Sequence, residues 1–207
     1  MECSPTCCYT RGMNLVRPIT RHDIKGPAIY AGMRDDYRNR VIAMKLHRRI
    51  ILGDRVEIVF DNRFILTLQI EETCRLENLT RDDQIEAEIA LSNELMPTRD
   101  SLAATLFIPM PAGADAKEVL GQLVGLDEHV VMSIGAHLLR AKFEAGRSES
   151  DRISAVQYLR FELSPEARTA LLNPGTPITV EIDHPNYRHR VECSDDLRAS
   201  LAADYGD

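Results

Sequence analysis

Apolar and polar residues alternate along several short stretches of this chain, and such alternation is typical of β-strands with one buried face. The clearest stretch covers residues 178–183, where Ile178, Val180 and Ile182 alternate with polar residues. A strand with a single apolar face has to be covered by another layer of structure. We therefore expect a sheet that carries a core on one face, combined with helices.

Strand and helix patterns follow one another in the order β-α-β-β-α-β between about residues 104 and 184. The expected strands cover residues 104–108, 129–134 with a bent continuation to 143, 155–163 and 178–182. The expected helices cover residues 115–124 and a segment that Ser164 caps and Pro165 begins. This order is that of the ferredoxin-like fold, so the predicted class is α+β, with an antiparallel sheet and helices on one face.

The N-terminal half is expected to contribute helices and one β-hairpin ahead of that sheet. Thr20 and Asp23 predict a capped helix start, which Pro27 interrupts before a second helix over residues 31–46. The hairpin is expected over residues 48–60, with its turn at Gly53. Residues 64–70 alternate like a strand, but helix formers follow, and the further helices are expected over residues 69–77, 81–95 and from Ser194 onward.

The charge balance narrows the class of partner that the chain can bind. The 25 Lys and Arg residues against 32 Asp and Glu residues give a formal net charge of −7. A broad nucleic-acid-binding face needs clustered positive charge, so we expect no nucleic-acid partner. No apolar run approaches the roughly 20 residues that span a bilayer, and the first residues lack the apolar segment of a signal peptide. We expect no membrane partner and a cytoplasmic location.

The five cysteines are odd in number and irregular in spacing, which argues against a disulfide framework and favours a reducing compartment. Cys3, Cys7 and Cys8 precede Met13, where sequence of ordered character begins. We expect residues 1–12 to be a disordered tail or the product of an upstream start codon. Residues 13–207 are expected to form a single α+β domain.

The chain lacks the short motifs by which many enzymes are recognised. The dinucleotide fingerprint GxGxxG, the phosphate loop GxxxxGK(S/T), HExxH and GxSxG do not occur in it. The sequence therefore names no cofactor and does not decide whether the protein is an enzyme.

Four residues are candidates for catalysis. Glu71, Glu72 and Arg75 are spaced to share one face of a helix, where they form either an acid–base group or an ordinary surface ion pair. His184 continues the apolar row of the strand over residues 178–182. It is either a general base or a histidine satisfied at the edge of the core.

The candidate metal ligands are His129, Asp183, His184 and His189. His129 follows two acidic residues ahead of a strand, and imidazole together with carboxylate can bind a metal ion. Asp183 and His184 are adjacent in a strand and therefore point to opposite faces, which argues against a ready-made ligand pair.

A basic cluster of Lys45, Arg48 and Arg49 is the candidate anion site. The alternative interpretation is a solvated strand end, since short runs of like charge are usually exposed to water.

Seven segments, taken in order along the chain, resemble an uncharacterised bacterial family, the domain of unknown function 3501. The segments are RVIAMKLHRRIILGDRVEIVFDNR (40–63), QIEETCRLE (69–77), NELMP (93–97), ATLFI (104–108), GLDEHV (125–130), VQYLRFEL (156–163) and VEIDHPNYRH (180–189). The resemblance covers nearly all of residues 13–190. The resemblance implies that the gene for this protein lies beside genes for rubrerythrin-like proteins and iron–sulfur oxidoreductases. It therefore implies that the protein takes part in peroxide defence or iron-dependent redox metabolism. It carries over no catalytic residues.

The leading hypothesis is an accessory protein that binds a redox partner, such as a rubrerythrin-like protein or an iron–sulfur oxidoreductase. One alternative is a metal-dependent redox enzyme that uses His184, His129 and carboxylates such as Glu71 or Glu72. Another alternative is a sensor of an anion or a small molecule at the basic cluster over residues 45–49.

Overall fold

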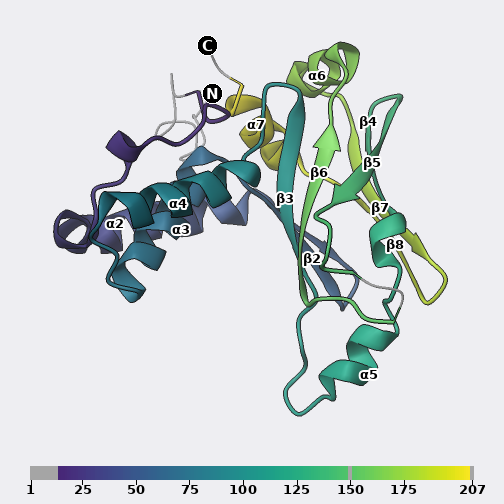
Figure 1. Cartoon of the computed structure of the whole chain (residues 1–207). Helices are drawn as coiled ribbons and strands as arrows, with labels where there is room; N and C mark the ends of the chain where they lie inside the picture. The colour runs from purple at the N-terminus through teal and green to yellow at the C-terminus, as the bar shows by residue number, and fades with distance from the viewer. Residues whose placement is uncertain (1–13, 149–150, 206–207) are drawn as a thin grey trace.

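The computed structural model describes residues 14–148 and 151–205, and the predicted tail over residues 1–12 lies outside them. The described strands form one eight-stranded antiparallel sheet in the order β1-β2-β3-β6-β5-β4-β7-β8 (Figure 1). The strands are β1 (Arg49–Leu52), β2 (Val56–Phe60), β3 (Ser101–Phe107), β4 (Val130–Ile134), β5 (His137–Phe143), β6 (Val156–Glu162), β7 (Ile178–His184) and β8 (Tyr187–Glu192). The first and last strands of this order contact each other, so the sheet nearly closes into a barrel.

The predicted ferredoxin-like order of the C-terminal half is wrong. The ferredoxin-like order needs four strands with the last beside the first, whereas this part of the chain contributes five strands in the order β3-β6-β5-β4-β7, so that β7 lies beside β4 and not beside β3. Residues 129–143, expected as one bent strand, form a hairpin of β4 and β5 that turns at Gly135, where φ is +57°. The β1–β2 hairpin does not precede a separate sheet but extends the same one, because β2 pairs with β3.

An aliphatic core fills the interior of the nearly closed sheet. Alternate residues of each strand point inward, as in β7, where Ile178, Val180 and Ile182 are buried. They belong to the same apolar cluster as Leu102 and Leu106 of β3. Each square ångström of apolar surface removed from water stabilises the fold by roughly 25 cal/mol, so this cluster is the main source of the sheet's stability.

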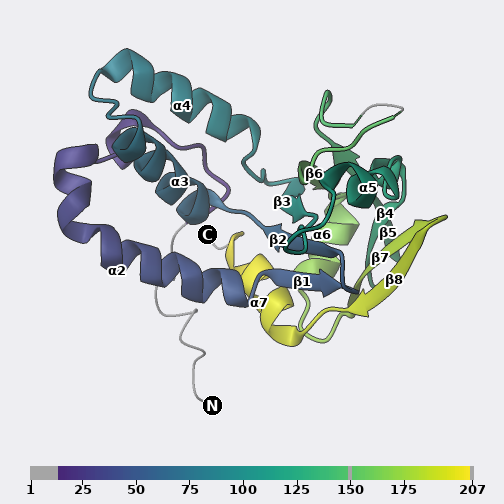
Figure 2. The same ribbon diagram turned by 90° about the horizontal axis from the view of Figure 1, so that it is seen from below.

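Three helices pack together on one side of the sheet (Figure 2). They are α2 (Pro27–Leu46), α3 (Arg63–Leu76) and α4 (Asp82–Glu94). Helix α3 lies between the other two: one apolar cluster joins it to α2 through Tyr30, Tyr37 and Ile65, and a second joins it to α4 through Ile70 and Ile85.

The central place of α3 explains why part of its sequence alternates like a strand. A helix that is covered on two sides needs apolar residues around most of its circumference. The buried residues of α3 accordingly run almost without interruption from Ile65 to Ile70. Asn62 caps the helix, because its Oδ1 accepts a hydrogen bond of 3.1 Å from Ile65 N.

Pro27 begins α2 instead of interrupting an earlier helix. The predicted helix at Thr20 is one 3₁₀ turn, η1 (Arg21–Asp23), in which the Asp23 carboxylate accepts hydrogen bonds from Thr20 N and Oγ1. Gly26, at φ +78°, then turns the chain into Pro27. Proline suits the first helical position because the N–H that it lacks would have no partner there, so α2 starts ahead of the expected residue 31.

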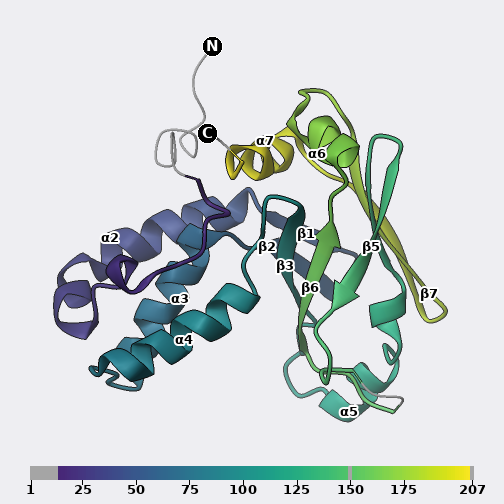
Figure 3. The ribbon, with the colours of Figure 1, turned by 45° about the horizontal axis from the view of Figure 1, so that its top comes forward.

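Short helices lie at the two ends of the sheet (Figure 3). Helices α6 (Pro165–Leu172) and α7 (Asp195–Ala203) lie at one end, and α5 (Ala116–Gly121) with the 3₁₀ turn η2 (Leu126–Glu128) lies towards the other. The predicted caps of α6 and α7 are confirmed: Ser164 Oγ accepts from Ala167 N and Ser194 Oγ accepts from Leu197 N, both at 3.2 Å.

The Tyr187 side chain joins the seam between β1 and β8. Tyr187 Oη donates a hydrogen bond to Leu52 O and accepts one of 2.9 Å from Arg55 N. Gly53 forms the turn beside it with φ +64°, and a Cβ on this residue would come within 2.5 Å of His189 Nε2. Glycine is therefore required here both for the turn and for the close approach of β8.

Candidate functional site

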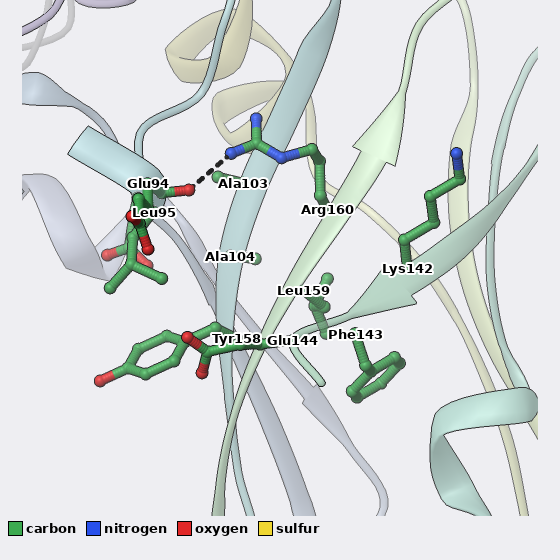
Figure 4. A pocket seen from close by; sticks show the side chains of 11 residues that line it. Glu94, Leu95, Ala103, Ala104, Lys142, Phe143, Glu144, Tyr158, Leu159 and Arg160 are labelled. Atoms are coloured by element: carbon green, nitrogen blue, oxygen red, sulfur yellow. Dashed lines mark hydrogen bonds between the residues drawn. The ribbon is translucent and has the colours of Figure 1, made fainter. Parts of the chain in front are cut away.

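Strands β3, β5 and β6 form a hollow on the outer side of the sheet, next to the C-terminal end of α4 (Figure 4). Its volume is about 290 Å³. Ala103 of β3 lies directly opposite Arg160 of β6, and its methyl group leaves space between the longer side chains around it. The lining residues are Asp61, Glu94, Leu95, Ala103, Ala104, Lys142, Phe143, Glu144, Tyr158, Leu159 and Arg160.

Asp61 is the buried acid of this hollow. It follows β2 directly, and its backbone N–H donates a hydrogen bond of 2.9 Å to Ala103 O. Thr105 Oγ1 donates a hydrogen bond of 2.6 Å to Asp61 Oδ2. Only 5% of the residue is exposed, and burial raises the pKa of its carboxyl, while the Thr105 hydrogen bond and the charges of Lys45 and Arg48 oppose the rise. A buried carboxyl with a perturbed pKa at a hollow is a candidate binding group.

Arg160 forms the wall of the hollow on the side of α4. Its guanidinium donates to Glu94 O at 3.0 Å, to Met96 O at 2.8 Å and to Ser101 Oγ at 2.6 Å. Carbonyl groups at the C-terminal end of a helix have no intrahelical donor and carry partial negative charge, so a cation is favourable there. Burial lowers the pKa of Arg160 from its ordinary value. Arg160 therefore fastens α4 to the sheet.

Ion pairs surround the mouth of the hollow. Lys142 Nζ lies 2.6 Å from Glu162 Oε1, and Arg147 pairs with Glu144. The Arg147 guanidinium also lies 4.3 Å from the centroid of the Tyr158 ring. The first ion pair is largely exposed to solvent and the second is partly exposed, so each contributes about 1 kcal/mol or less to stability.

A buried ion pair of Arg48 and Asp204 adjoins Asp61. Arg48 Nη1 and Nη2 donate to the two Asp204 oxygens at 3.1 and 2.5 Å, and Nη2 also donates to Asp61 O at 3.2 Å. Arg48 Nε donates to Phe60 O, and Asn62 Nδ2 donates to Asp204 Oδ1 at 2.8 Å. These bonds connect the start of β1, the end of β2 and α7. All three nitrogens of the Arg48 guanidinium are therefore bonded to other groups of the protein.

The predicted catalytic residue Glu71 lies away from the hollow, at the start of α2. Its two carboxylate oxygens accept hydrogen bonds from Lys25 N at 2.5 Å and from Gly26 N at 3.1 Å. Burial raises the pKa of Glu71, and these two backbone hydrogen bonds oppose the rise. The geometry is that of a side chain that supplies acceptors to the unsatisfied N–H groups at a helix start.

Glu72 and Arg75 form an ion-pair group with α2. Glu72 Oε1 accepts from Arg34 Nε at 2.7 Å and from Tyr30 Oη at 2.6 Å, and Oε2 accepts from Arg75 Nη2 at 3.0 Å. The hydrogen bonds from Arg34, Arg75 and Tyr30 lower the pKa of Glu72 to about 2. The structure thus brings Glu72 and Arg75 together, but it places no part of His184 near them.

His184 is buried at the edge of the core, as the alternation in β7 predicts. Its Nδ1 lies 3.2 Å from Asn186 N, and its Nε2 lies 2.9 Å from Val124 O. Because the Asn186 N–H can only donate, Nδ1 accepts, and Nε2 carries the proton that it donates to Val124. Both ring nitrogens are therefore engaged by the backbone.

Of the predicted metal ligands, His129 and His184 meet in space, with ring centroids 5.3 Å apart in an edge-to-face arrangement. The Asp183 carboxylate points to the other face of the sheet, where it pairs with Arg188 at 2.9 Å. His189 lies at the β1–β8 seam beside Gly53. Within residues 14–148 and 151–205, no group of three or more His, Cys, Asp or Glu is arranged to hold a metal ion.

The structure does not gather the predicted anion-binding residues. Arg48 is buried in its ion pair with Asp204. Arg49 points outward from β1 and pairs with Glu57 at 3.0 Å. Lys45 belongs to the last turn of α2.

Sequence reasoning missed Asp61, Tyr158 and Arg160 as lining residues. The pair Asp61-Asn62 looks like a turn signal, and the burial of Asp61 depends on Thr105, which is 44 residues away in the chain. Arg160 could have been found, because it alternates with the buried residues Leu159 and Phe161 and so points outward from β6.

The fold and the hollow define a class of protein: an eight-stranded antiparallel sheet, nearly closed into a barrel, flanked by a layer of three helices. The chain belongs to the family described as protein of unknown function DUF3501, whose model matches residues 18–205, and this confirms the resemblance of the seven segments. A solved structure of a novel protein of unknown function from Burkholderia pseudomallei K96243 is similar to it, with a TM-score of 0.84 and 28% sequence identity over 92% of this chain and 100% of that chain. Comparison with curated proteins gives no match. In the described residues, no helix is both long enough and apolar enough to cross a membrane.

Proposed function

We propose that this protein is an accessory protein that binds a redox partner, either a rubrerythrin-like protein or an iron–sulfur oxidoreductase, in peroxide defence or iron-dependent redox metabolism. The observation that carries the proposal is a group of exposed aliphatic side chains where α2 leads into β1, here named the α2–β1 patch. Its members are Ile42, Leu46 and Ile51, which are 44%, 66% and 61% exposed. Exposed aliphatic groups in succession are typical of protein-binding surfaces.

The geometry of α2 and β1 directs these three side chains to solvent. Ile42 and Leu46 are four residues apart and therefore lie on the same side of α2. Met44 points to the other side and is buried in the cluster with α3. Ile51 points outward from β1 because its neighbour Ile50 points into the core. The patch thus consists of apolar groups that the fold does not need for its own core.

The rim of the α2–β1 patch is charged. Arg38 is exposed one turn before Ile42. Arg49 lies on the same outward side of β1 as Ile51 and pairs with Glu57, which lies opposite Ile51 on β2. Interfaces combine an apolar centre with a polar rim. The chemistry of the patch therefore fits a partner whose apolar surface is bordered by polar and charged residues.

The residues that the sequence offers for chemistry are engaged by the fold, which supports a binding role. Both nitrogens of His184 and both carboxylate oxygens of Glu71 bond to backbone groups. The Arg48 guanidinium is taken up by its buried ion pair.

A titration of the purified protein with purified partner tests the proposal. A rubrerythrin-like protein and an iron–sulfur oxidoreductase are each titrated by calorimetry. We expect saturable binding of one of them and at least about tenfold weaker binding for the I42D/L46D double variant, since tenfold corresponds to roughly 1.4 kcal/mol.

The matched control is Leu172→Asp, which changes an exposed leucine of α6, a helix that contributes no residue to the patch. It should bind the partner as the unmodified protein does. Equal weakening by both sets of substitutions, or no binding of either partner, would contradict the proposal.

A further inference from the structure

One carboxylate oxygen of Asp61 is available to a ligand. Oδ2 accepts the Thr105 hydrogen bond, whereas no described residue donates a hydrogen bond to Oδ1. The residue is only 5% exposed and lines the hollow beside α4. The positive charge of Lys45 lowers the pKa of Asp61, although these two described residues form no ion pair. A carboxylate oxygen that lines a hollow and has no donor from the protein can accept a hydrogen bond from a ligand that enters the hollow.

The cations on the wall of the hollow do not supply that donor. Arg160 directs its Nη atoms to two backbone carbonyls and to Ser101. Lys142 is paired with Glu162. Glu94 lines the same hollow, and its carboxylate forms no ion pair with another described residue. The arginine and lysine side chains of the wall therefore leave Asp61 Oδ1 and the Glu94 carboxylate without a donor.

The size and the walls of the hollow suit a small molecule with an apolar stem. Its volume of about 290 Å³ is at the low end of the roughly 300–1,000 Å³ of small-molecule sites. Ala103 supplies the space, and Leu95, Phe143 and the Tyr158 ring supply apolar surface around it. Figure 4 shows Arg160 hydrogen-bonded to Glu94 at one end of the hollow and Tyr158 with Glu144 at the other.

We infer that this hollow binds a small organic cation, whose ammonium or guanidinium group donates to Asp61 Oδ1 and whose stem lies against the apolar walls. An anion is disfavoured, because it would meet the carboxylates of Asp61, Glu94 and Glu144, while Arg160 and Lys142 are already bonded. The site is separate from the α2–β1 patch, so neither proposal depends on the other.

Three four-carbon compounds test the inference on the full-length protein: putrescine, 1,4-butanediol and succinate. They share a stem and differ in charge, being cationic, neutral and anionic. We expect putrescine to raise the melting temperature in a concentration-dependent way and to give a saturable calorimetric isotherm. Agmatine, which carries a guanidinium group, should behave like putrescine, whereas the diol and succinate should leave the melting temperature unchanged.

Substitutions locate the site. Asp61→Asn removes the charge with little change of shape, and we expect at least a tenfold loss of putrescine affinity, as for other buried charge pairs. Should this variant fold poorly, Glu94→Gln at the exposed mouth provides an independent test, with a several-fold loss. The matched control is Glu86→Gln, an exposed acid of α4 outside the hollow, which should bind as the unmodified protein does.

Two results would overturn the inference. One is the same response, or no response, to the cation, the diol and the dianion. The other is a putrescine affinity that neither Asp61→Asn nor Glu94→Gln changes, because binding would then occur elsewhere on this acidic protein.

Discussion

Gly53 carries two structural requirements at one residue, and they can be separated by experiment. Its φ of +64° is a conformation that L side chains rarely adopt, and a Cβ would also come within 2.6 Å of Tyr187 Oη. We expect Gly53→Ala to lower the free energy of unfolding by well over the 1–2 kcal/mol or so that left-handed backbone alone costs. Urea denaturation measures the change.

Gly146→Ala is the matched control, because Gly146 has φ +86° and nothing lies within 4 Å of its would-be Cβ. It should show the backbone cost without the clash at the seam. Equal destabilisation by the two substitutions would mean that the close approach of β8 to Gly53 contributes nothing to stability.

The hydrogen bonds of Glu72 lead us to expect a specific dependence of the free energy of unfolding on pH. Hydrogen bonds from Arg34, Arg75 and Tyr30 lower its pKa from 4.5 to about 2 in the folded protein. A carboxyl with a depressed folded pKa stabilises the protein fully above its unfolded pKa, and this contribution is lost as the pH falls towards the folded pKa. We expect the stability difference between the unmodified protein and Glu72→Gln to be constant above about pH 4.5 and to shrink between pH 4.5 and 2.

Urea titrations of both proteins at a series of pH values measure this difference. Glu71, the neighbouring acid, has a raised pKa and serves as the contrast, since its replacement by Gln should not show the same loss in acid. A difference for Glu72→Gln that persists unchanged at pH 2 would contradict the assignment of the ion-pair group.

At the scale of elements, the seam between β1 and β8 depends on one side chain. Tyr187 Oη bonds to Leu52 O and to Arg55 N, and burial raises its pKa. We expect Tyr187→Phe to lower the free energy of unfolding by about 2 kcal/mol, because two hydrogen bonds are lost and their backbone partners remain partly buried. Hydrogen exchange of the β1 and β8 amides should accelerate more than that of β3.

Tyr158→Phe is the control for this prediction. It also removes a phenolic hydroxyl from a strand, but no described residue hydrogen-bonds to the hydroxyl of Tyr158. Comparable destabilisation by both substitutions would show that Tyr187 does not hold the seam.

At the scale of the whole molecule, the Arg48–Asp204 ion pair joins the helical layer, the sheet and the C-terminal helix. Both side chains are almost fully buried, at 1% and 2% exposure. We expect Asp204→Ala to lower the free energy of unfolding by about 3–5 kcal/mol, because it leaves a buried guanidinium without its counter-charge. Denaturant unfolding followed by circular dichroism measures the loss.

Asp183→Ala gives the comparison, since its ion pair with Arg188 is exposed and should be worth about 1 kcal/mol or less. Replacing both partners of the buried pair, as in R48M/D204L, should restore much of the stability that D204A loses. A D204A protein as stable as the unmodified one would show that the pair does not join these layers.

Local signals account for the parts of the fold that the sequence predicts well. The caps at Ser164 and Ser194, the proline that begins α6 and the turn at Gly53 depend on bonds between residues close in the chain. The outward place of Asp183 and the inward place of His184 follow from strand alternation in the same way. The start of α2 at Pro27 differs from the expected residue 31 because proline breaks the interior of a helix but suits its first position.

The sequence by itself determined most of the strands, the hairpin turn at Gly53, the helix caps at Ser164 and Ser194, and the family to which the chain belongs. Only the tertiary structure decided the order of the strands, the near closure of the sheet and which residues line the hollow. The physical reason is that those features rest on partners far apart in the chain, such as Asp61 with Thr105 and Arg48 with Asp204. Alternation assigns a side chain to one face of a strand, but which strand lies beside it is settled by packing of the whole core.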